Sequence, residues 1–196
     1  ITVSGLPNGL IRSPSWSSDS QYLAFVIEQK NSANLWVYNV STKQARQLSD
    51  TPLNSVLTRT PYMWLPDSSA IVANAAVNLG KTRLTNDSTA VVPVIQQSTG
   101  EKAPARTYQN LLSSPFDEAQ FKFFGQSQLT YIPLSGQAQP IGQAGLIKSF
   151  SVSPDSTNIL VGMIDEPFSY QVPYQRFAAT WQIWGMRGYT LAELAK

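Results

Sequence analysis

The stretch SVSPDSTNILVG, from Ser151 to Gly162, places a Ser-Pro-Asp-Ser turn directly before an apolar strand. Two earlier stretches have the same form: SWSSDSQYLAFV at 15–26 and MWLPDSSAIVAN at 63–74. Proline presets one backbone dihedral of such a turn, and aspartate and serine side chains bond to the turn's own backbone. Because β-prone residues flank each copy, each stretch predicts a hairpin of two antiparallel strands.

The spacing of the three turns indicates how the hairpins are organised. Asp67 follows Asp19 by 48 residues, and Asp155 follows Asp67 by 88 residues. Repeats of roughly 40–45 residues are typical of β-propellers, in which each repeat is a four-stranded antiparallel blade. The first spacing therefore fits one blade, and the second fits one blade with an insertion of about forty residues. The sequence predicts an all-β fold, a partial β-propeller of about three blades.

The strands of each predicted blade can be followed along the chain. In the strand at 21–28, apolar side chains fill both faces, as expected for a sheet sandwiched between two neighbours. We expect all of 1–196 to form one partial propeller domain. The predicted blades are 12–49 for the first, 58–79 with 127–142 for the second around an insertion at 80–126, and 147–196 for the third, including a loop at 165–179.

A stack of three blades is an incomplete propeller. Closed propellers carry about four to eight blades. An open stack leaves two apolar faces without a neighbour, which favours aggregation. We therefore expect the chain to be a piece of a longer protein.

The insertion changes character along its length. Its first part is polar and contains proline, which predicts an extended surface loop. Its second part carries helix signals: Ser114 as N-cap, Pro115 at the first helical position, and Asp117 and Glu118 in the first turn, where the helix dipole favours acids. Gly125 is a stop signal. The sequence predicts one short helix inside the second blade.

Composition excludes several classes of function. The chain is 42% hydrophobic and 13% charged, and its 14 basic and 12 acidic residues give a formal net charge of +2. That charge is too small for a typical nucleic-acid reader. No apolar run reaches the ~18 residues of a transmembrane helix. We expect neither nucleic acid nor a membrane as partner, and the absence of cysteine excludes disulfides.

The chain contains no histidine, which excludes a Ser-His-Asp or Cys-His site built from its own residues. No lysine has a serine three residues before it, so the Ser-x-x-Lys pattern is absent as well. The acidic residues show no calcium-loop spacing. We predict that the chain alone is not an enzyme, that it has no catalytic residue, and that it takes no metal or cofactor.

Four charged residues are candidates for weak substrate contacts. Asp117 and Glu118 could face water as ordinary helix-start acids, or contact the amino terminus or basic groups of a peptide. For Arg106 and Arg176, the alternatives are capping or surface pairing, or contact with a substrate carboxylate. The sequence leaves both pairs of interpretations open.

Three strings carry a family resemblance: RTYQNLLSSPFDEAQFKFFGQSQL at 106–129, EPFSYQVPYQRF at 166–177 and WQIWGMRG at 181–188. With them, nearly the whole chain resembles the propeller of the prolyl oligopeptidase family of serine peptidases. Within that family it is most similar to the glutamyl endopeptidase-like branch of bacteria and chloroplasts. The insertion helix and the loop at 166–177 are the most specific parts of the match.

The resemblance implies a two-domain serine peptidase, in which an amino-terminal propeller covers the active site of a carboxy-terminal α/β-hydrolase domain. The chain would then be a non-catalytic segment that gates and positions peptide substrates. The implied partners are that hydrolase domain and peptides. The family also suggests a periplasmic or secreted location, with a cytoplasmic one as the alternative.

Two other functions compete with this interpretation. One is a binding propeller without peptidase activity, of the periplasmic TolB type, which uses similar turns. The other is a free-standing module of three blades, which would need to dimerise or swap strands to cover its edges. The parent sequence discriminates between them, because a Gly-x-Ser-x-Gly nucleophile elbow followed by Asp and His indicates the peptidase.

Overall fold

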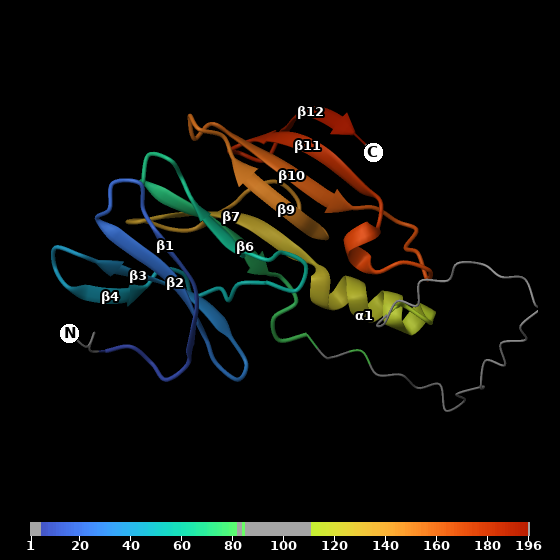
Figure 1. The fold of residues 1–196 in the computed structure, drawn as a ribbon, viewed down its shortest axis with the longest axis horizontal. Helices are drawn as coiled ribbons and strands as arrows, with labels where there is room; N and C mark the ends of the chain where they lie inside the picture. Colours follow the sequence, from blue (N-terminus) through green and yellow to red (C-terminus); the bar gives the residue numbers. More distant parts are fainter. Residues whose placement is uncertain (1–4, 82–83, 85–110, 196) are drawn as a thin grey trace, which may run out of the picture.

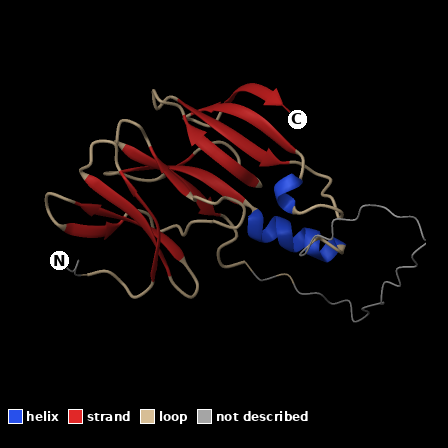
Figure 2. Ribbon diagram, in the orientation of Figure 1, coloured by secondary structure: helices blue, strands red, loops and turns tan. Residues whose placement is uncertain are grey.

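The structure is a computed structural model that describes residues 5–81, 84 and 111–195. Within these residues the chain forms three four-stranded antiparallel sheets and one α-helix (Figures 1 and 2). The sheets follow one another across the molecule in chain order, and they do not close into a ring. The predicted fold class, a partial β-propeller of three blades, is confirmed.

Each sheet keeps the strand order of a propeller blade. The first sheet is β1 (Leu10–Trp16), β2 (Tyr22–Glu28), β3 (Ala33–Asn39) and β4 (Gln44–Gln47). The second is β5 (Tyr62–Trp64), β6 (Ala70–Ala76), β7 (Ser127–Pro133) and β8 (Gln139–Pro140). The third is β9 (Ile147–Val152), β10 (Asn158–Ile164), β11 (Ala179–Gly185) and β12 (Thr190–Ala195).

The second sheet combines segments that are far apart in the sequence. Strand β6 pairs with β7 along its whole length, from Ala70 opposite Pro133 to Ala76 opposite Ser127. The insertion therefore leaves one sheet and returns to it. In the first sheet, β1 begins at Leu10, which pairs with Glu28, so this sheet starts two residues before the predicted position 12.

The three turns share one hydrogen-bonding scheme. In each, the aspartate side chain accepts a bond from the backbone N–H two residues later, at 3.0 Å for Gln21, 3.0 Å for Ser69 and 3.1 Å for Thr157. The serine after each aspartate has a left-handed backbone, which is uncommon for a residue other than glycine. The φ values are 59° for Ser20, 63° for Ser68 and 61° for Ser156.

Two apolar cores lie between the three sheets and pack them together. The first lies between the first and second sheets, and the second lies between the second and third. Burial of these side chains is the main force that stacks the blades. The fully buried members of the first core are Ala24, Leu35, Ile71 and Ala73, and those of the second are Val72, Leu129, Ile141, Ile147, Ile159 and Val161.

The insertion helix, α1 (Pro115–Gly125), begins and ends where the sequence predicts. The Ser114 hydroxyl accepts a hydrogen bond from the Asp117 N–H at 3.1 Å, which is the expected N-cap. Gly125 packs so closely on Leu57 that an added Cβ would lie 3.0 Å from its side chain. Among the described residues, no helix has the length and apolarity to cross a bilayer.

Candidate functional site

Two buried asparagines fix the loop that precedes β5. The Asn54 side-chain amide donates to the carbonyl oxygens of Phe124 and Gln126, at 2.8 Å and 3.0 Å, at the end of α1. The Asn74 side-chain amide in turn donates to the Asn54 carbonyl at 3.0 Å. Because buried carbonyl groups need hydrogen-bond partners, these bonds tie the loop at 53–61 to both β6 and the insertion helix.

An aromatic cluster joins α1 to the loop between β10 and β11. Phe121 of α1 meets Phe168 edge-on at a centroid distance of 5.1 Å and Phe177 at 5.6 Å. Beside them, Lys122 forms an ion pair with Glu166 at 2.6 Å, with its ammonium 5.4 Å from the Phe168 ring. Such aromatic pairs each contribute about 0.5–1.5 kcal/mol beyond the area they bury. The second-blade insertion is thus fixed to the third blade.

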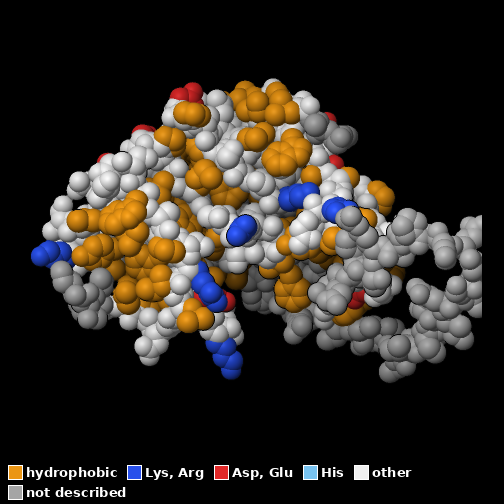
Figure 3. Space-filling view, viewed as in Figure 1, with side chains coloured by type: hydrophobic (Ala, Val, Ile, Leu, Met, Phe, Trp, Pro, Cys, Tyr) orange, Lys and Arg blue, Asp and Glu red, His pale blue; other side chains and the backbone are white. Residues whose placement is uncertain are grey.

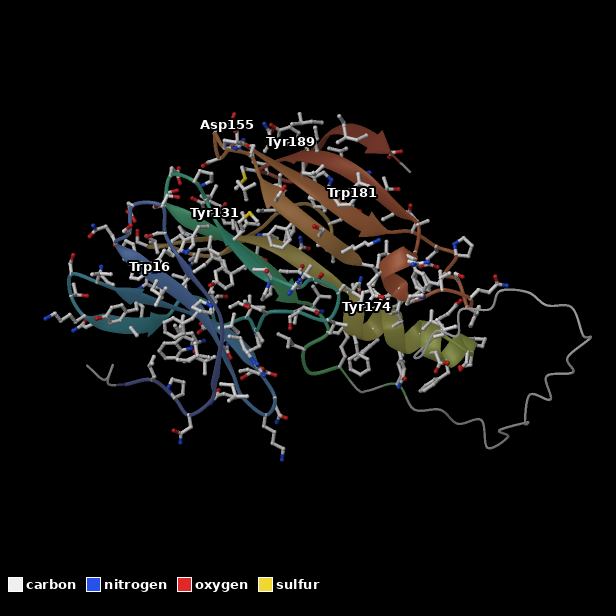
Figure 4. All side chains as sticks on the ribbon, in the orientation of Figure 1. Trp16, Tyr131, Asp155, Tyr174, Trp181 and Tyr189 are labelled. Carbon is white, nitrogen blue, oxygen red and sulfur yellow. The ribbon has the colours of Figure 1, made fainter. Side chains whose placement is uncertain are left out.

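These contacts surround a cleft of about 500 Å³ between the second and third blades. One wall is the loop before β5, and another is the inner strand β9. The 3₁₀ helix η1 (Tyr174–Arg176) and strand β11 complete the cleft, and Figure 4 labels their residues Tyr174 and Trp181. The lining residues are 55–59 of the loop, Lys148 and Ser149 of β9, Tyr174 and Gln175 of η1, and Trp181 of β11.

The cleft is positively charged. Arg59 and Lys148 line it, and none of the described residues that line it is acidic. The Lys148 ammonium lies 3.4 Å from the carbonyl oxygen of Phe177, and Arg59 takes part in no ion pair with the described residues. Two cations without a local counter-ion attract an anionic group, and arginine matches a carboxylate with two parallel hydrogen bonds.

A smaller cleft of about 320 Å³ adjoins the first and shares Ser55, Thr58 and Arg59 with it. Its own cation, Arg12, is paired with Glu28 at 3.1 Å. Arg59 therefore lines both clefts and forms no ion pair with the described residues. Figure 3 shows Lys and Arg side chains along the middle of this face, while most acidic side chains lie near the outline.

The aromatic wall of the larger cleft depends on a glycine. An added Cβ on Gly162 would lie 3.0 Å from the Trp181 ring, so the indole rests directly on the backbone of β10. Tyr174 stands on the neighbouring wall, 6.0 Å from Phe121. Flat aromatic surfaces beside cations suit a peptide that has both apolar and carboxylate groups.

Of the predicted contact residues, Asp117, Glu118 and Arg176 do not line this cleft. Asp117 accepts hydrogen bonds from the Ser113 hydroxyl and N–H, which lower the pKa of its carboxyl group. Glu118 is beside Tyr170, and partial burial together with this carboxylate raises the pKa of the Tyr170 phenol. Arg176 ends η1, next to the lining residue Gln175. Arg106 lies outside the described residues.

The cleft combines hydroxyl groups with two cations. Its hydroxyl groups are those of Ser55, Thr58, Ser149 and Tyr174, and no carboxylate is among the described residues that line it. Among the described residues, no group of three His, Cys, Asp or Glu side chains could hold a metal ion. The arrangement suits an anionic ligand.

No protein-family model matches the chain. A probable chloroplastic glutamyl endopeptidase of Oryza sativa subsp. japonica is 30% identical to it over 203 residues, which cover 98% of this chain and 21% of that protein. The corresponding protein of Arabidopsis thaliana is 27% identical over 201 residues, with the same two shares. The chain is a relative of the glutamyl endopeptidases. It spans about a fifth of the length of the curated relatives it matches.

Solved structures show the fold of this chain. The β-propeller domain of the Trilobed protease from Pyrococcus furiosus matches 95% of the chain with a TM-score of 0.51 at 12% identity, over 42% of that chain. Pyrococcus horikoshii acylaminoacyl peptidase matches the same share with a TM-score of 0.51 at 16% identity, over 25% of that chain. The resemblance to the prolyl oligopeptidase family and its glutamyl endopeptidase-like branch is confirmed.

The sequence alone did not identify the cations and aromatic residues that line the cleft. Arg59 and Lys148 are 89 residues apart, and neither belongs to a motif. The available signal was topological: one precedes β5 and the other lies on β9, and these are the first strands of consecutive blades. Because first strands of neighbouring blades lie side by side, their charged residues are brought together.

Proposed function

We propose that the chain is the non-catalytic propeller segment of a serine peptidase, where it admits and positions peptide substrates. Its similarity to proteins named glutamyl endopeptidases and its propeller fold support this role. The chain has no histidine, so a catalytic triad needs residues from elsewhere in the parent protein. The proposed partner is therefore an α/β-hydrolase domain of the parent chain, in a periplasmic or secreted enzyme.

The observation that carries the proposal is the pre-formed cationic cleft. The hydrogen bonds of Asn54 and the Phe121 cluster hold its walls in place before any ligand binds. A preorganised site loses less conformational entropy on binding than a mobile one. We propose that Arg59 and Lys148 engage a carboxylate of the peptide while Tyr174 and Trp181 contact its apolar part.

The residues predicted from sequence have a secondary place in this proposal. Asp117 is used to cap α1, so we propose that it acts by fixing the helix. Glu118 and Arg176 lie on the two elements that the aromatic cluster joins, and we propose them, with Arg106, as outer contacts of a longer peptide. These roles are weaker than those of Arg59 and Lys148, because Asp117, Glu118 and Arg176 do not line the cleft.

A comparison of substrates tests the gating role in the full-length parent. The parent should cleave a short acidic peptide and leave a folded protein containing the same sequence intact. Removal of the propeller should abolish that difference or inactivate the enzyme. If the intact parent cleaved both substrates equally well, gating would be wrong. If the parent had no peptidase activity at all, a binding propeller would replace the proposal.

A further inference from the structure

Two hydrogen bonds lock the first and second blades together at the turn end of the sheets. The backbone N–H of Asp19 donates to the Ser68 hydroxyl at 3.1 Å. The Trp64 indole N–H donates to the Ser15 carbonyl oxygen at 3.2 Å. Both side chains that make these bonds, the acceptor Ser68 and the donor Trp64, are buried and belong to the second blade. The second blade is therefore hydrogen-bonded to the first blade through one tryptophan and one turn serine.

The third blade has lost this pair of contacts. The position three residues before the turn aspartate, which is Trp64 in the second blade, is Val152 in the third. Its turn serine, Ser156, has a buried hydroxyl that finds no hydrogen-bond partner among the described residues. A cleft of about 630 Å³ lies at this junction, lined by both Asp67 and Ser156. The tryptophan and the serine bond thus occur together at one junction and are both missing at the other.

The first blade carries both residues at the same offsets. Trp16 precedes Asp19 by three residues and Ser20 follows it, as Trp64 and Ser68 do around Asp67. The backbone at Ser20 has φ of 59°, against 63° at Ser68. Yet the Trp16 side chain is 59% exposed, whereas that of Trp64 is 8% exposed. The first blade therefore has the same pair of groups, but no blade among the described residues packs against them.

Strand register places these groups on the correct face. Ser15, whose carbonyl oxygen accepts the Trp64 hydrogen bond, pairs with Ala24 in the sheet. Ala24 belongs to the core between the first two blades. Trp16 pairs with Leu23 and so projects from the opposite face, together with Ile11, which is 56% exposed. Figure 4 labels Trp16 at the outer side of the first sheet, and Figure 3 shows a broad hydrophobic area there.

We infer that the face bearing Trp16 and Ser20 docks another propeller blade that lies earlier in the parent chain. The Trp16 indole N–H would donate to a backbone carbonyl oxygen of that blade's first strand. The Ser20 hydroxyl would accept from an N–H of its turn. We identify the occupant as a blade, because the second blade uses the equivalent residues, Trp64 and Ser68, to bind the first blade. The curated relatives, nearly five times longer than the matched region, have chain to supply it.

The test is hydroxyl-radical footprinting of the full-length parent, with each tryptophan compared with itself in the urea-unfolded protein. Trp16 should be protected at least fivefold, within twofold of the protection of Trp64. Oxidation of Trp16 at the unfolded rate would overturn the inference. Protection lost on dilution, with a dimer-to-monomer change in sedimentation, would also overturn it, because the occupant would then be a second copy.

A second measurement separates docking at Ser20 from general burial. Ser20→Ala in the parent should lower the urea midpoint of propeller unfolding by as much as Ser68→Ala. Ser156→Ala is the matched control, because it removes a hydroxyl without a partner from the same turn position. If Ser20→Ala behaved like Ser156→Ala, the proposed hydrogen bond to a preceding blade would be wrong.

Discussion

Asn54, in the loop before β5, donates its side-chain amide to the carbonyl oxygen of Phe124 at the end of α1, 2.8 Å away. The bond joins segments that are 70 residues apart and sets the position of the cleft wall. Asn54→Ala should destabilise the fold by about 1–3 kcal/mol, because two partly buried hydrogen bonds are lost. Urea unfolding measures this loss. Asn31→Ala, at an exposed hairpin position, should change stability by no more than about 0.5 kcal/mol.

The turn serines give a prediction about the blade junctions. Ser68→Ala should cost about 1 kcal/mol, since the Asp19 N–H loses its acceptor. Ser156→Ala should be neutral or slightly stabilising, because its hydroxyl is buried without a partner. Both replacements leave a non-glycine residue at positive φ, so backbone strain cancels in the comparison. Equal losses in thermal unfolding experiments would contradict the assignment of these bonds.

Gly162 supports the aromatic wall of the cleft. Gly162→Ala places a Cβ about 3 Å from the Trp181 ring, and the ring must move toward the cleft. We expect a loss of about 1–3 kcal/mol in stability and weaker peptide binding. Tryptophan fluorescence and peptide titration measure the two effects. Gly145→Ala is the control, because its Cβ would meet only the flexible end of Met163; an equally large loss there would rule out the special role of Trp181.

Stability should fall in acid. Hydrogen bonds from Ser17 and Ser153 lower the pKa of Asp19 and Asp155 below the ordinary value of 3.8, and Ser113 does the same for Asp117. Carboxylates with a lowered pKa stabilise the fold above the unfolded pKa, and this contribution disappears as the pH falls through the folded pKa. The urea midpoint should therefore decrease below about pH 4. Asp155→Asn should weaken this dependence, and an unchanged pH profile would show that the turn contributes nothing to it.

Much of the fold could be predicted from the three turns and the helix signals. Ser114, Pro115 and Gly125 predict the helix by local chemistry alone, and the structure places its ends there. The aspartate turns likewise depend on side chains one or two residues away. Such signals need no knowledge of neighbouring blades.

The cleft could not be predicted in the same way. Its walls come from the loop before β5, from β9, from η1 and from β11, and their contact depends on how the blades stack. The two Asn54 bonds span 70 and 72 residues, and the packing of Phe121 on Phe168 spans 47, without a repeating pattern. Asp117 and Glu118 drew attention as charges, whereas the unpaired Arg59 had no distinguishing neighbours in the sequence.

Peptide cleavage by the full-length parent is the most direct test of the central claim, that the chain positions acidic peptides through Arg59 and Lys148. Arg59→Gln and Lys148→Gln should each lower kcat/KM for an acidic peptide about tenfold, equivalent to ~1.4 kcal/mol, chiefly through KM. For a neutral peptide of equal length, kcat/KM should stay unchanged in these variants. The control Lys43→Gln, at an exposed turn outside the cleft, should leave kcat/KM unchanged for both peptides. Equal loss on acidic and neutral peptides, or no loss on either, would contradict the account.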